Sequence, residues 1–128
     1  MTEGDEKKRL ILIVEDDPKS MILVEEILRA HGFATIGATN GRDAVEMARK
    51  AMPDLILMDI QLPEMNGLEA TRILKADPLT SGIPVLAMTA YAMVGDEERA
   101  LEAGCNGYIS KPIDLKGFIL KVQELLSS

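Results

Sequence analysis

The chain has 128 residues, 47% of them hydrophobic and 27% charged, a composition typical of one globular domain. Its formal net charge of −7 disfavours nucleic-acid binding, because nonspecific affinity for phosphates depends on Lys and Arg. The only cysteine, Cys105, excludes an intramolecular disulfide and fits a reducing, cytoplasmic location. No apolar stretch is long enough to span a membrane, and the start, MTEGDEKKR, lacks a signal-peptide pattern. We expect a flexible charged tail over 1–8 and a domain over 9–128.

Five short apolar runs predict β-strands, and helical patterns alternate with them. The strands are expected at Leu10–Val14, Phe33–Ala38, Leu55–Met58, Val85–Met88 and Gly107–Ser110. Most of these runs are apolar throughout, which is typical of a sheet covered on both faces.

The helices are delimited by capping residues, glycines and prolines. The first is expected to begin with Asp17 as N-cap and Pro18, and to end at Gly32; the second contains Ala44, Ala48 and Ala51 and stops before Pro53. The third begins at Asn66, with Glu69 three residues later, and the fourth runs roughly from Met93 to Ala103 before Gly104. The fifth follows Asp114 and has an apolar stripe of Leu115, Phe118, Ile119, Val122 and Leu126. Five β-α units in succession predict an α/β fold with a parallel sheet and helices on both faces.

Acidic residues follow two of the predicted strands. Glu15, Asp16 and Asp17 come after the first strand, and Asp59 comes after the third. Sites in open parallel sheets lie beyond the carboxyl ends of the strands, so several carboxylates would meet in one cleft if these strands are neighbours. Neighbouring carboxylates repel one another unless a bound cation offsets their negative charge. Mg²⁺ suits this role because it prefers carboxylate oxygens as ligands.

Two further polar residues end the last strands. Thr89 would supply a hydroxyl and Lys111 a positive charge, and together with the acids they suit a phosphoryl group. Asp59 could then act as a nucleophile that carries the phosphoryl group. Structural alternatives stay open: Asp17 is expected to be an ordinary helix cap, and Thr89 and Lys111 could be structural or solvated residues.

Four motifs in this order, LIVEDDP, LILMDIQLPEMNGLE, AMTAYA and GYISKPI, resemble the receiver domain of bacterial two-component response regulators. The resemblance extends from about Arg9 to Leu126. It implies a flavodoxin-like (βα)5 fold, doubly wound, with five parallel strands in the order 2-1-3-4-5. Because no further domain follows the last helix, a stand-alone regulator is expected.

The resemblance also implies a role for each site residue. Asp59 would be the phosphoacceptor, and Mg²⁺ would be held by Glu15, Asp16, Asp59 and the backbone carbonyl of Gln61. Thr89 and Lys111 would contact the phosphoryl group. Tyr108 would be the switch aromatic that turns inward when Thr89 moves; simple packing of Tyr108 is the alternative.

Two positions depart from the family pattern or add to it. Glu15 is one methylene longer than the commoner Asp, so its contact with the metal is expected to pass through water. Tyr91 is bulky, and we hypothesise that it hinders water from reaching the phosphorylated Asp59. The Lys111–Pro112 peptide looks like the cis peptide of the family.

The implied function is a phosphoryl-accepting switch rather than an enzyme, with its own chemistry for self-phosphorylation and slow autodephosphorylation. A histidine kinase or histidine phosphotransfer protein would donate the phosphoryl group, and a downstream protein would read the result. A phosphorylation-dependent dimer would use helix 4 to helix 5. An unphosphorylated interaction module is the alternative; a phosphatase is disfavoured because Gln61 stands where an acid/base Asp would be expected.

Overall fold

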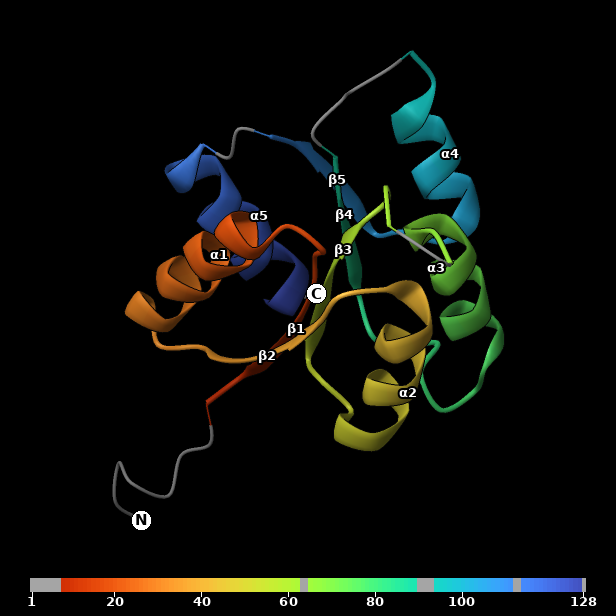
Figure 1. Cartoon of the computed structure of the whole chain (residues 1–128), viewed down its shortest axis with the longest axis horizontal. Helices are drawn as coiled ribbons and strands as arrows, with labels where there is room; N and C mark the ends of the chain where they lie inside the picture. The colour runs from red at the N-terminus through yellow and green to blue at the C-terminus, as the bar shows by residue number, and fades with distance from the viewer. Residues whose placement is uncertain (1–7, 63–64, 90–93, 112–113, 128) are drawn as a thin grey trace.

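A computed structural model of the chain describes residues 8–62, 65–89, 94–111 and 114–127. It consists of five β-α units in succession (Figure 1). The elements are β1 (Leu10–Val14), α1 (Pro18–Ala30), β2 (Ala34–Ala38), α2 (Gly41–Ala51), β3 (Leu55–Asp59), α3 (Gly67–Ala76), β4 (Val85–Thr89), α4 (Asp96–Ala103), β5 (Gly107–Ser110) and α5 (Leu115–Ser127). None of the described helices is long and apolar enough to span a membrane.

The five strands form one parallel sheet in the order β2-β1-β3-β4-β5, which confirms the expected topology. The chain runs outward from β1 to β2 and then returns to the other side of β1 to add β3, β4 and β5. The switch point therefore lies between β1 and β3, whose carboxyl ends are neighbours.

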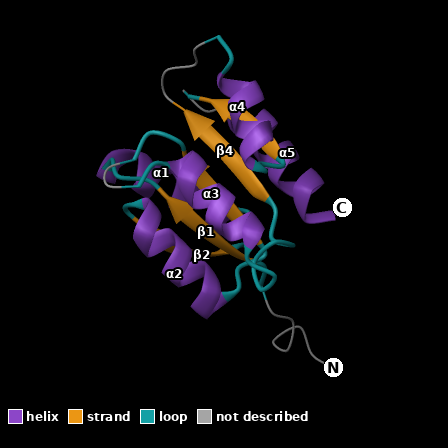
Figure 2. Cartoon of the chain, turned by 90° about the vertical axis from the view of Figure 1, so that its right-hand side faces the viewer, coloured by secondary structure: helices purple, strands orange, loops and turns teal. Residues whose placement is uncertain are grey.

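Helices cover both faces of this sheet, with α1 and α5 on one face and α2, α3 and α4 on the other (Figures 1 and 2). Side chains of β1 alternate between the two layers: Leu12 and Val14 join the core under α2 and α3, whereas Ile11 and Ile13 join the core under α1 and α5. This double burial explains why the strands are apolar throughout, since each face must be covered by apolar side chains.

The predicted strand ends differ from the observed ones by one residue. β3 extends to Asp59, which is in register with Met88, and β4 extends to Thr89, which is in register with Ser110. β2 begins at Ala34 rather than Phe33. The polar residues at the ends of β3 and β4 are thus inside the ladder, and their backbones are fixed by it.

Side-chain caps begin three of the helices as predicted. Asp17 accepts from the Lys19 N–H, Asn66 from the Glu69 N–H at 2.9 Å, and Asp114 from the Gly117 N–H at 3.2 Å. These bonds satisfy amide groups that have no partner within their own helix.

The predicted start of α4 at Met93 is wrong. Val94 and Gly95 form a turn, and the helix begins at Asp96. Gly95 has a φ of 89°, in the left-handed region, which is incompatible with a continuous right-handed helix through this position. The C-terminal end is as expected, because Gly104 ends the helix with a φ of 109°.

Candidate functional site

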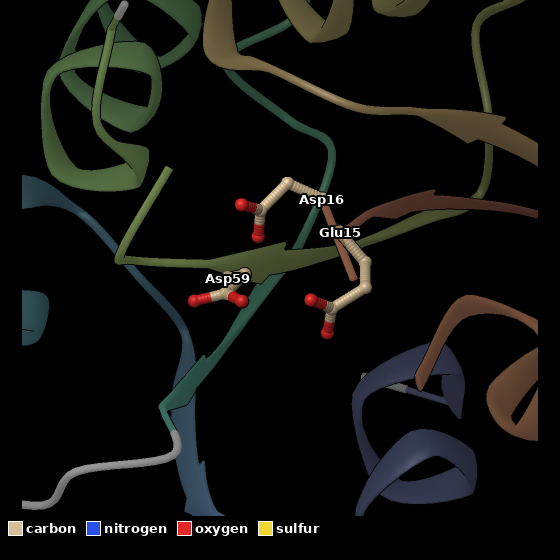
Figure 3. A group of neighbouring side chains, drawn as sticks. All are labelled: Glu15, Asp16 and Asp59. Atoms are coloured by element: carbon tan, nitrogen blue, oxygen red, sulfur yellow. The ribbon is translucent and has the colours of Figure 1, made fainter. Parts of the chain in front are cut away.

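Three carboxylates meet at the carboxyl edge of the sheet (Figure 3). Glu15 and Asp16 follow β1, and Asp59 ends the neighbouring β3. One carboxylate oxygen from each of the three lies within 4.8 Å of the others. Glu15 is 1% exposed and Asp59 is 5% exposed, whereas Asp16 is exposed to solvent. The structure therefore brings together the acids that the sequence predicted.

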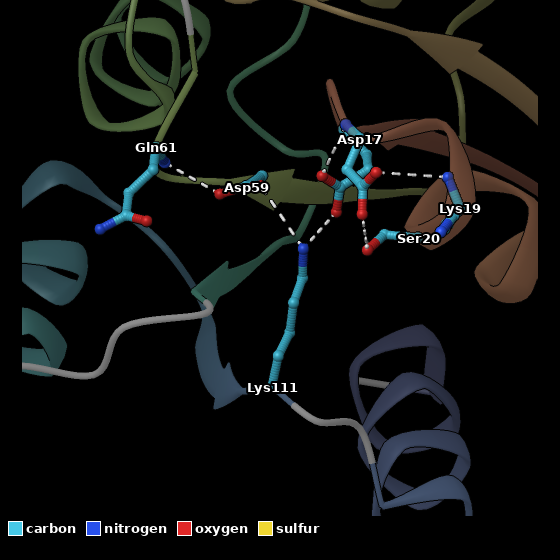
Figure 4. A network of polar contacts seen from close by, with 7 residues as sticks. Asp17, Lys19, Ser20, Asp59, Gln61 and Lys111 are labelled. Atoms are coloured by element: carbon cyan, nitrogen blue, oxygen red, sulfur yellow. Dashed lines mark hydrogen bonds and ion pairs between the residues drawn. The ribbon is translucent and has the colours of Figure 1, made fainter.

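Lys111 brings a positive charge into this cluster from the end of β5 (Figure 4). Its ammonium forms an ion pair with Glu15 Oε1 and lies 3.5 Å from Asp59 Oδ2. The backbone N–H of Lys111 donates to the Thr89 carbonyl oxygen at 2.7 Å, and this bond holds the end of β5 against the end of β4. Burial lowers the pKa of Lys111, but the Glu15 and Asp59 carboxylates raise it by more, so the ammonium is the stable form.

Asp59 has the electrostatics of a carboxylate kept from bulk water. Burial raises its pKa from 3.8 to about 6, and the nearby Glu15 charge acts in the same direction. The Gln61 N–H donates to Asp59 Oδ1 at 2.9 Å and, like the Lys111 charge, works against this rise. Oδ1 is thus held by the backbone of the following turn, while Oδ2 faces Lys111.

Asp17 does not belong to the carboxylate cluster. Its Oδ2 accepts from the Ser20 hydroxyl at 2.9 Å and its Oδ1 from the Lys19 N–H at 3.4 Å. The Ser20 hydrogen bond contributes most to a lowered pKa of this carboxyl. The expectation that Asp17 is an ordinary helix cap is confirmed, although its N–H also donates to Glu15 Oε2 at 3.1 Å.

Thr89 lies on β4, the strand that neighbours that of Asp59, and Tyr108 lies on β5. Thr89 ends β4 and is fully buried, and Tyr108 is half-buried in register with Ala87. The Tyr108 ring packs against the core on the α2–α3 side of the sheet. Burial raises the pKa of its phenol, and the acidic residues Asp96 and Glu97 of α4 raise it further. The role of Tyr108 as a switch stays a prediction.

The sequence reasoning missed one residue that shapes the site. Gly67 begins α3, and a Cβ there would lie 2.3 Å from the Asp59 carbonyl oxygen and 2.8 Å from the Ile60 Cα. Only glycine allows α3 to pack so closely behind the end of β3. The motif LILMDIQLPEMNGLE contains this glycine, but its local pattern indicates only the start of a helix. The contact between Gly67 and the end of β3 forms between two elements, so no local pattern in the sequence predicts it.

Two predictions lie outside the described residues, namely the role of Tyr91 and the conformation of the Lys111–Pro112 peptide. His31, the only histidine, donates from its Nδ1–H to the Ile27 carbonyl oxygen at 2.9 Å, since a carbonyl oxygen can only accept. It is the C-cap of α1.

The arrangement suits a reaction in which negative charge accumulates at Asp59. A buried carboxylate lies close to two further acids and to the Lys111 ammonium, at a sheet edge where parallel strands place their sites. The oxygen-only donor set of Glu15, Asp16 and Asp59 fits a hard divalent cation such as Mg²⁺.

Known proteins share this sequence and architecture. The family model of the response regulator receiver domain matches residues 11–123. The polar-differentiation response regulator DivK of Brucella anthropi is 50% identical over 116 residues, which cover 91% of this chain and 94% of that protein.

Among solved structures, the receiver domain of a sensor histidine kinase from Pseudomonas aeruginosa, with a magnesium ion coordinated in its active-site cleft, is 35% identical. It superposes with a TM-score of 0.89 and covers 95% of this chain and 100% of that one. The signal receiver domain of a histidine kinase from Syntrophus aciditrophicus is 38% identical, with a TM-score of 0.86 and coverages of 93% and 90%. With fold, acidic edge and sequence in agreement, the chain belongs to the response regulator receiver domain family.

Proposed function

We propose that Asp59 accepts a phosphoryl group from a phosphohistidine of a histidine kinase or histidine phosphotransfer protein, and that this step requires Mg²⁺. Receiver domains are signalling switches rather than classical enzymes. The observation that carries the proposal is the position of Asp59, a buried carboxylate within 4.8 Å of two other acids and 3.5 Å from an ammonium.

The transfer would exchange one bond for another. Asp59 attacks phosphorus through a carboxylate oxygen, the bond from phosphorus to the histidine nitrogen breaks, and an acyl phosphate forms. The Lys111 ammonium neutralises charge on the phosphoryl oxygens, and the Thr89 hydroxyl can donate to one of them. Gln61 holds Asp59 Oδ1 through its N–H, which leaves Oδ2, on the Lys111 side, as the attacking oxygen.

Mg²⁺ is supported by the chemistry of the donor set, which contains only oxygen. Asp16, Asp59 and the Gln61 carbonyl would hold the ion directly, and Glu15 through water. When bound, the ion would offset the charge of the acids and of the phosphoryl oxygens. The magnesium ion in the cleft of the Pseudomonas aeruginosa receiver supports this assignment.

Phosphorylation would act as a local change of charge that biases two conformations of the molecule. Thr89 would move toward the phosphoryl group, and Tyr108 would follow and alter the surface from α4 to α5. That surface would contact the downstream protein or a second copy of the chain. We further propose that phosphorylated Asp59 loses its phosphoryl group slowly, because Tyr91 hinders the attacking water. The receiver unit would cover residues 9–128.

An intact-mass experiment tests the proposal. The protein is incubated with Mg²⁺ and a small phosphodonor, with and without EDTA. We expect one added phosphoryl group, lost with EDTA and lost in Asp59→Asn. Asp17→Asn is the matched control, because it removes a carboxylate at the same sheet edge that serves only as a cap, and it should still be phosphorylated. No adduct would favour an interaction module, and continuous phosphate release at high turnover would favour a phosphatase.

A further inference from the structure

The start of α2 lies against the loop that follows β3, and this contact leaves no room for a side chain. Gly41 is the first residue of α2 and is buried. A Cβ at this position would lie 2.3 Å from the Met65 carbonyl oxygen and 3.0 Å from the carbonyl carbon and the Cβ of Met65. Because the oxygen is the nearest atom, the Met65 carbonyl points toward the first turn of α2, where the partial positive charge of a helix start favours it.

The backbone of Gly41 does not itself require glycine. Its φ lies outside the left-handed region. The helix start is capped by a side chain, because Asn40 Oδ1 accepts from the Asp43 N–H at 2.8 Å. Within a helix alanine is favoured over glycine, so a glycine here lowers helix stability. The close approach of Met65 is the feature that accounts for it.

The loop between β3 and α3 has little room to yield. Helices α2 and α3 lie side by side over one face of the sheet (Figures 1 and 2). The side chains of Leu62 and Met65 pack against the core of that face. The Gly67 N–H donates to the Ile60 carbonyl oxygen at 3.3 Å, so the two ends of the loop are joined. Met65 is therefore held between the first turn of α2 and the start of α3.

The same loop carries the backbone that holds the acceptor carboxylate. The Gln61 N–H donates to Asp59 Oδ1 at 2.9 Å (Figure 4). Under the proposed function the Gln61 carbonyl is also a ligand of Mg²⁺. Because the loop is short and its ends are joined, a displacement of Met65 would be passed to the Gln61 backbone.

We infer that Gly41 is a positioning residue for the cation site: by leaving space for the Met65 carbonyl, it allows the loop to place the Gln61 backbone beside Asp59. This inference rests on the proposed function. An alanine at position 41 would have to push the Met65 carbonyl away by roughly 1 Å to reach an ordinary van der Waals distance. Mg²⁺ tolerates little displacement of its ligands, because it demands near-ideal octahedral geometry.

Amide NMR of the metal-free full chain tests the positioning role without the ion. In Gly41→Ala we expect the Gln61 amide proton to move upfield and its exchange with water to accelerate by about tenfold, because its bond to Asp59 is weakened. Gly32→Ala is the matched control, because a φ of 89° strains the backbone there while the surrounding space is open. It should lower stability and leave the Gln61 signal in place. An unchanged Gln61 signal in Gly41→Ala, or an equal change in Gly32→Ala, would overturn the inference.

A titration with Mg²⁺, followed in the same spectra, separates this inference from the proposed function. We expect the Kd of Gly41→Ala to rise by about tenfold, as for other residues that orient metal ligands. Gly32→Ala and Gly82→Ala, whose added methyl groups meet open space, should bind as the wild type does. Equal Kd values for Gly41→Ala and wild type would overturn the inference and leave the proposed function standing. A wild-type protein that does not bind Mg²⁺ would instead overturn the proposed function, and the inference with it.

The wild-type protein provides a test that does not depend on the folding of any variant. The Gly41 Hα resonances should shift when Mg²⁺ is added, because the loop that holds the ion lies against them. Those of Gly32 and Gly82 should not shift. If the Gln61 amide responded to Mg²⁺ while Gly41 did not, the contact at Met65 would not be linked to the cation site and the inference would be wrong.

Discussion

At the scale of single residues, the site holds charges that lower the stability of the fold. Asp59 is 5% exposed, and burial raises its pKa to about 6. The unfolded chain ionises near 3.8, so the native state binds more protons than the unfolded state between these values. Stability from this group is therefore greatest below about pH 4, falls as the pH rises toward 6, and stays reduced at neutral pH.

Asp59→Asn should accordingly stabilise the metal-free protein at pH 7. The difference between the two pKa values corresponds to an upper limit of roughly 3 kcal/mol, and we expect about 1–2 kcal/mol because the amide keeps some polar cost. Urea denaturation in EDTA measures the free energy of unfolding. At pH 4 the gain should shrink, because the wild-type carboxyl is then protonated in the native state. A destabilised Asp59→Asn at pH 7 would contradict this account.

Removing Lys111 should have the opposite effect. In Lys111→Met the buried Glu15 carboxylate loses its partner, and breaking a buried pair from one side costs about 3–5 kcal/mol when no solvent replaces it. Since Lys111 is 14% exposed and water can enter, we expect a loss of roughly 2–3 kcal/mol.

The double variant Lys111→Met with Glu15→Gln is the control for this loss. It removes both charges of the pair, so most of the lost stability should return, as a double-mutant cycle by urea denaturation would show. Additive effects of the two substitutions would mean that the Glu15–Lys111 contact contributes nothing to stability.

At the scale of elements, the sequence was most informative where the signal is local. The caps at Asp17, Asn66 and Asp114 were predictable because each bond spans two or three residues. The start of α4 was not, because Gly95 could be read as one more helical residue until its φ of 89° was known. The contact of Gly67 with the end of β3 was also hidden, since it depends on how α3 packs against the sheet.

The C-terminal end of α4 offers a test of this packing. A Cβ at Gly104 would lie 2.7 Å from the Lys75 Cγ, and the φ of 109° is itself unfavourable for alanine. Lys75 has little freedom to move, because its ammonium donates to the Ser81 and Ile83 carbonyls at 3.2 and 2.7 Å. We expect Gly104→Ala to lower the free energy of unfolding by about 2–3 kcal/mol.

Two other glycines separate the causes of that loss. Gly32 has a φ of 89° with open space around it, so Gly32→Ala should cost only the backbone strain, about 1 kcal/mol. Gly82 has open space and no positive φ, so Gly82→Ala should change stability by less than about 0.5 kcal/mol or slightly increase it. Equal losses for Gly104→Ala and Gly32→Ala would show that the contact with Lys75 is easily relieved.

At the scale of the whole molecule, the strand order makes the site. Because β1 and β3 are neighbours, residues 44 positions apart, Glu15 and Asp59, come within reach of one cation. The sequence predicted this meeting from alternation of strands and helices and from acids at strand ends. It could not predict that Lys111 pairs more closely with Glu15 than with Asp59, because that choice depends on side-chain geometry across four strands, from β1 to β5.

The same topology couples cation binding to folding and to pH. An ion that binds only the native state stabilises it, by about 2.7 kcal/mol at a hundred times its Kd. The ion needs an ionised Asp59, whose pKa is about 6 in the metal-free protein, so affinity should fall as the pH falls through 6. We expect Mg²⁺ to raise the melting temperature clearly at pH 7.5 and very little at pH 5.

Thermal melts at both pH values, with and without Mg²⁺, measure this dependence. Asp16→Asn is the control, because it removes an exposed carboxylate that we propose binds the ion, and it should abolish the Mg²⁺ effect at either pH while changing the metal-free melting temperature little. The stabilisation by Mg²⁺ thus grows as the pH rises. In the metal-free protein the contribution of Asp59 to stability falls as the pH rises, because protonation of this buried carboxylate removes the cost of its charge. If Mg²⁺ raised the melting temperature equally at pH 5 and pH 7.5, the buried carboxylate at the end of β3 would not be part of the cation site.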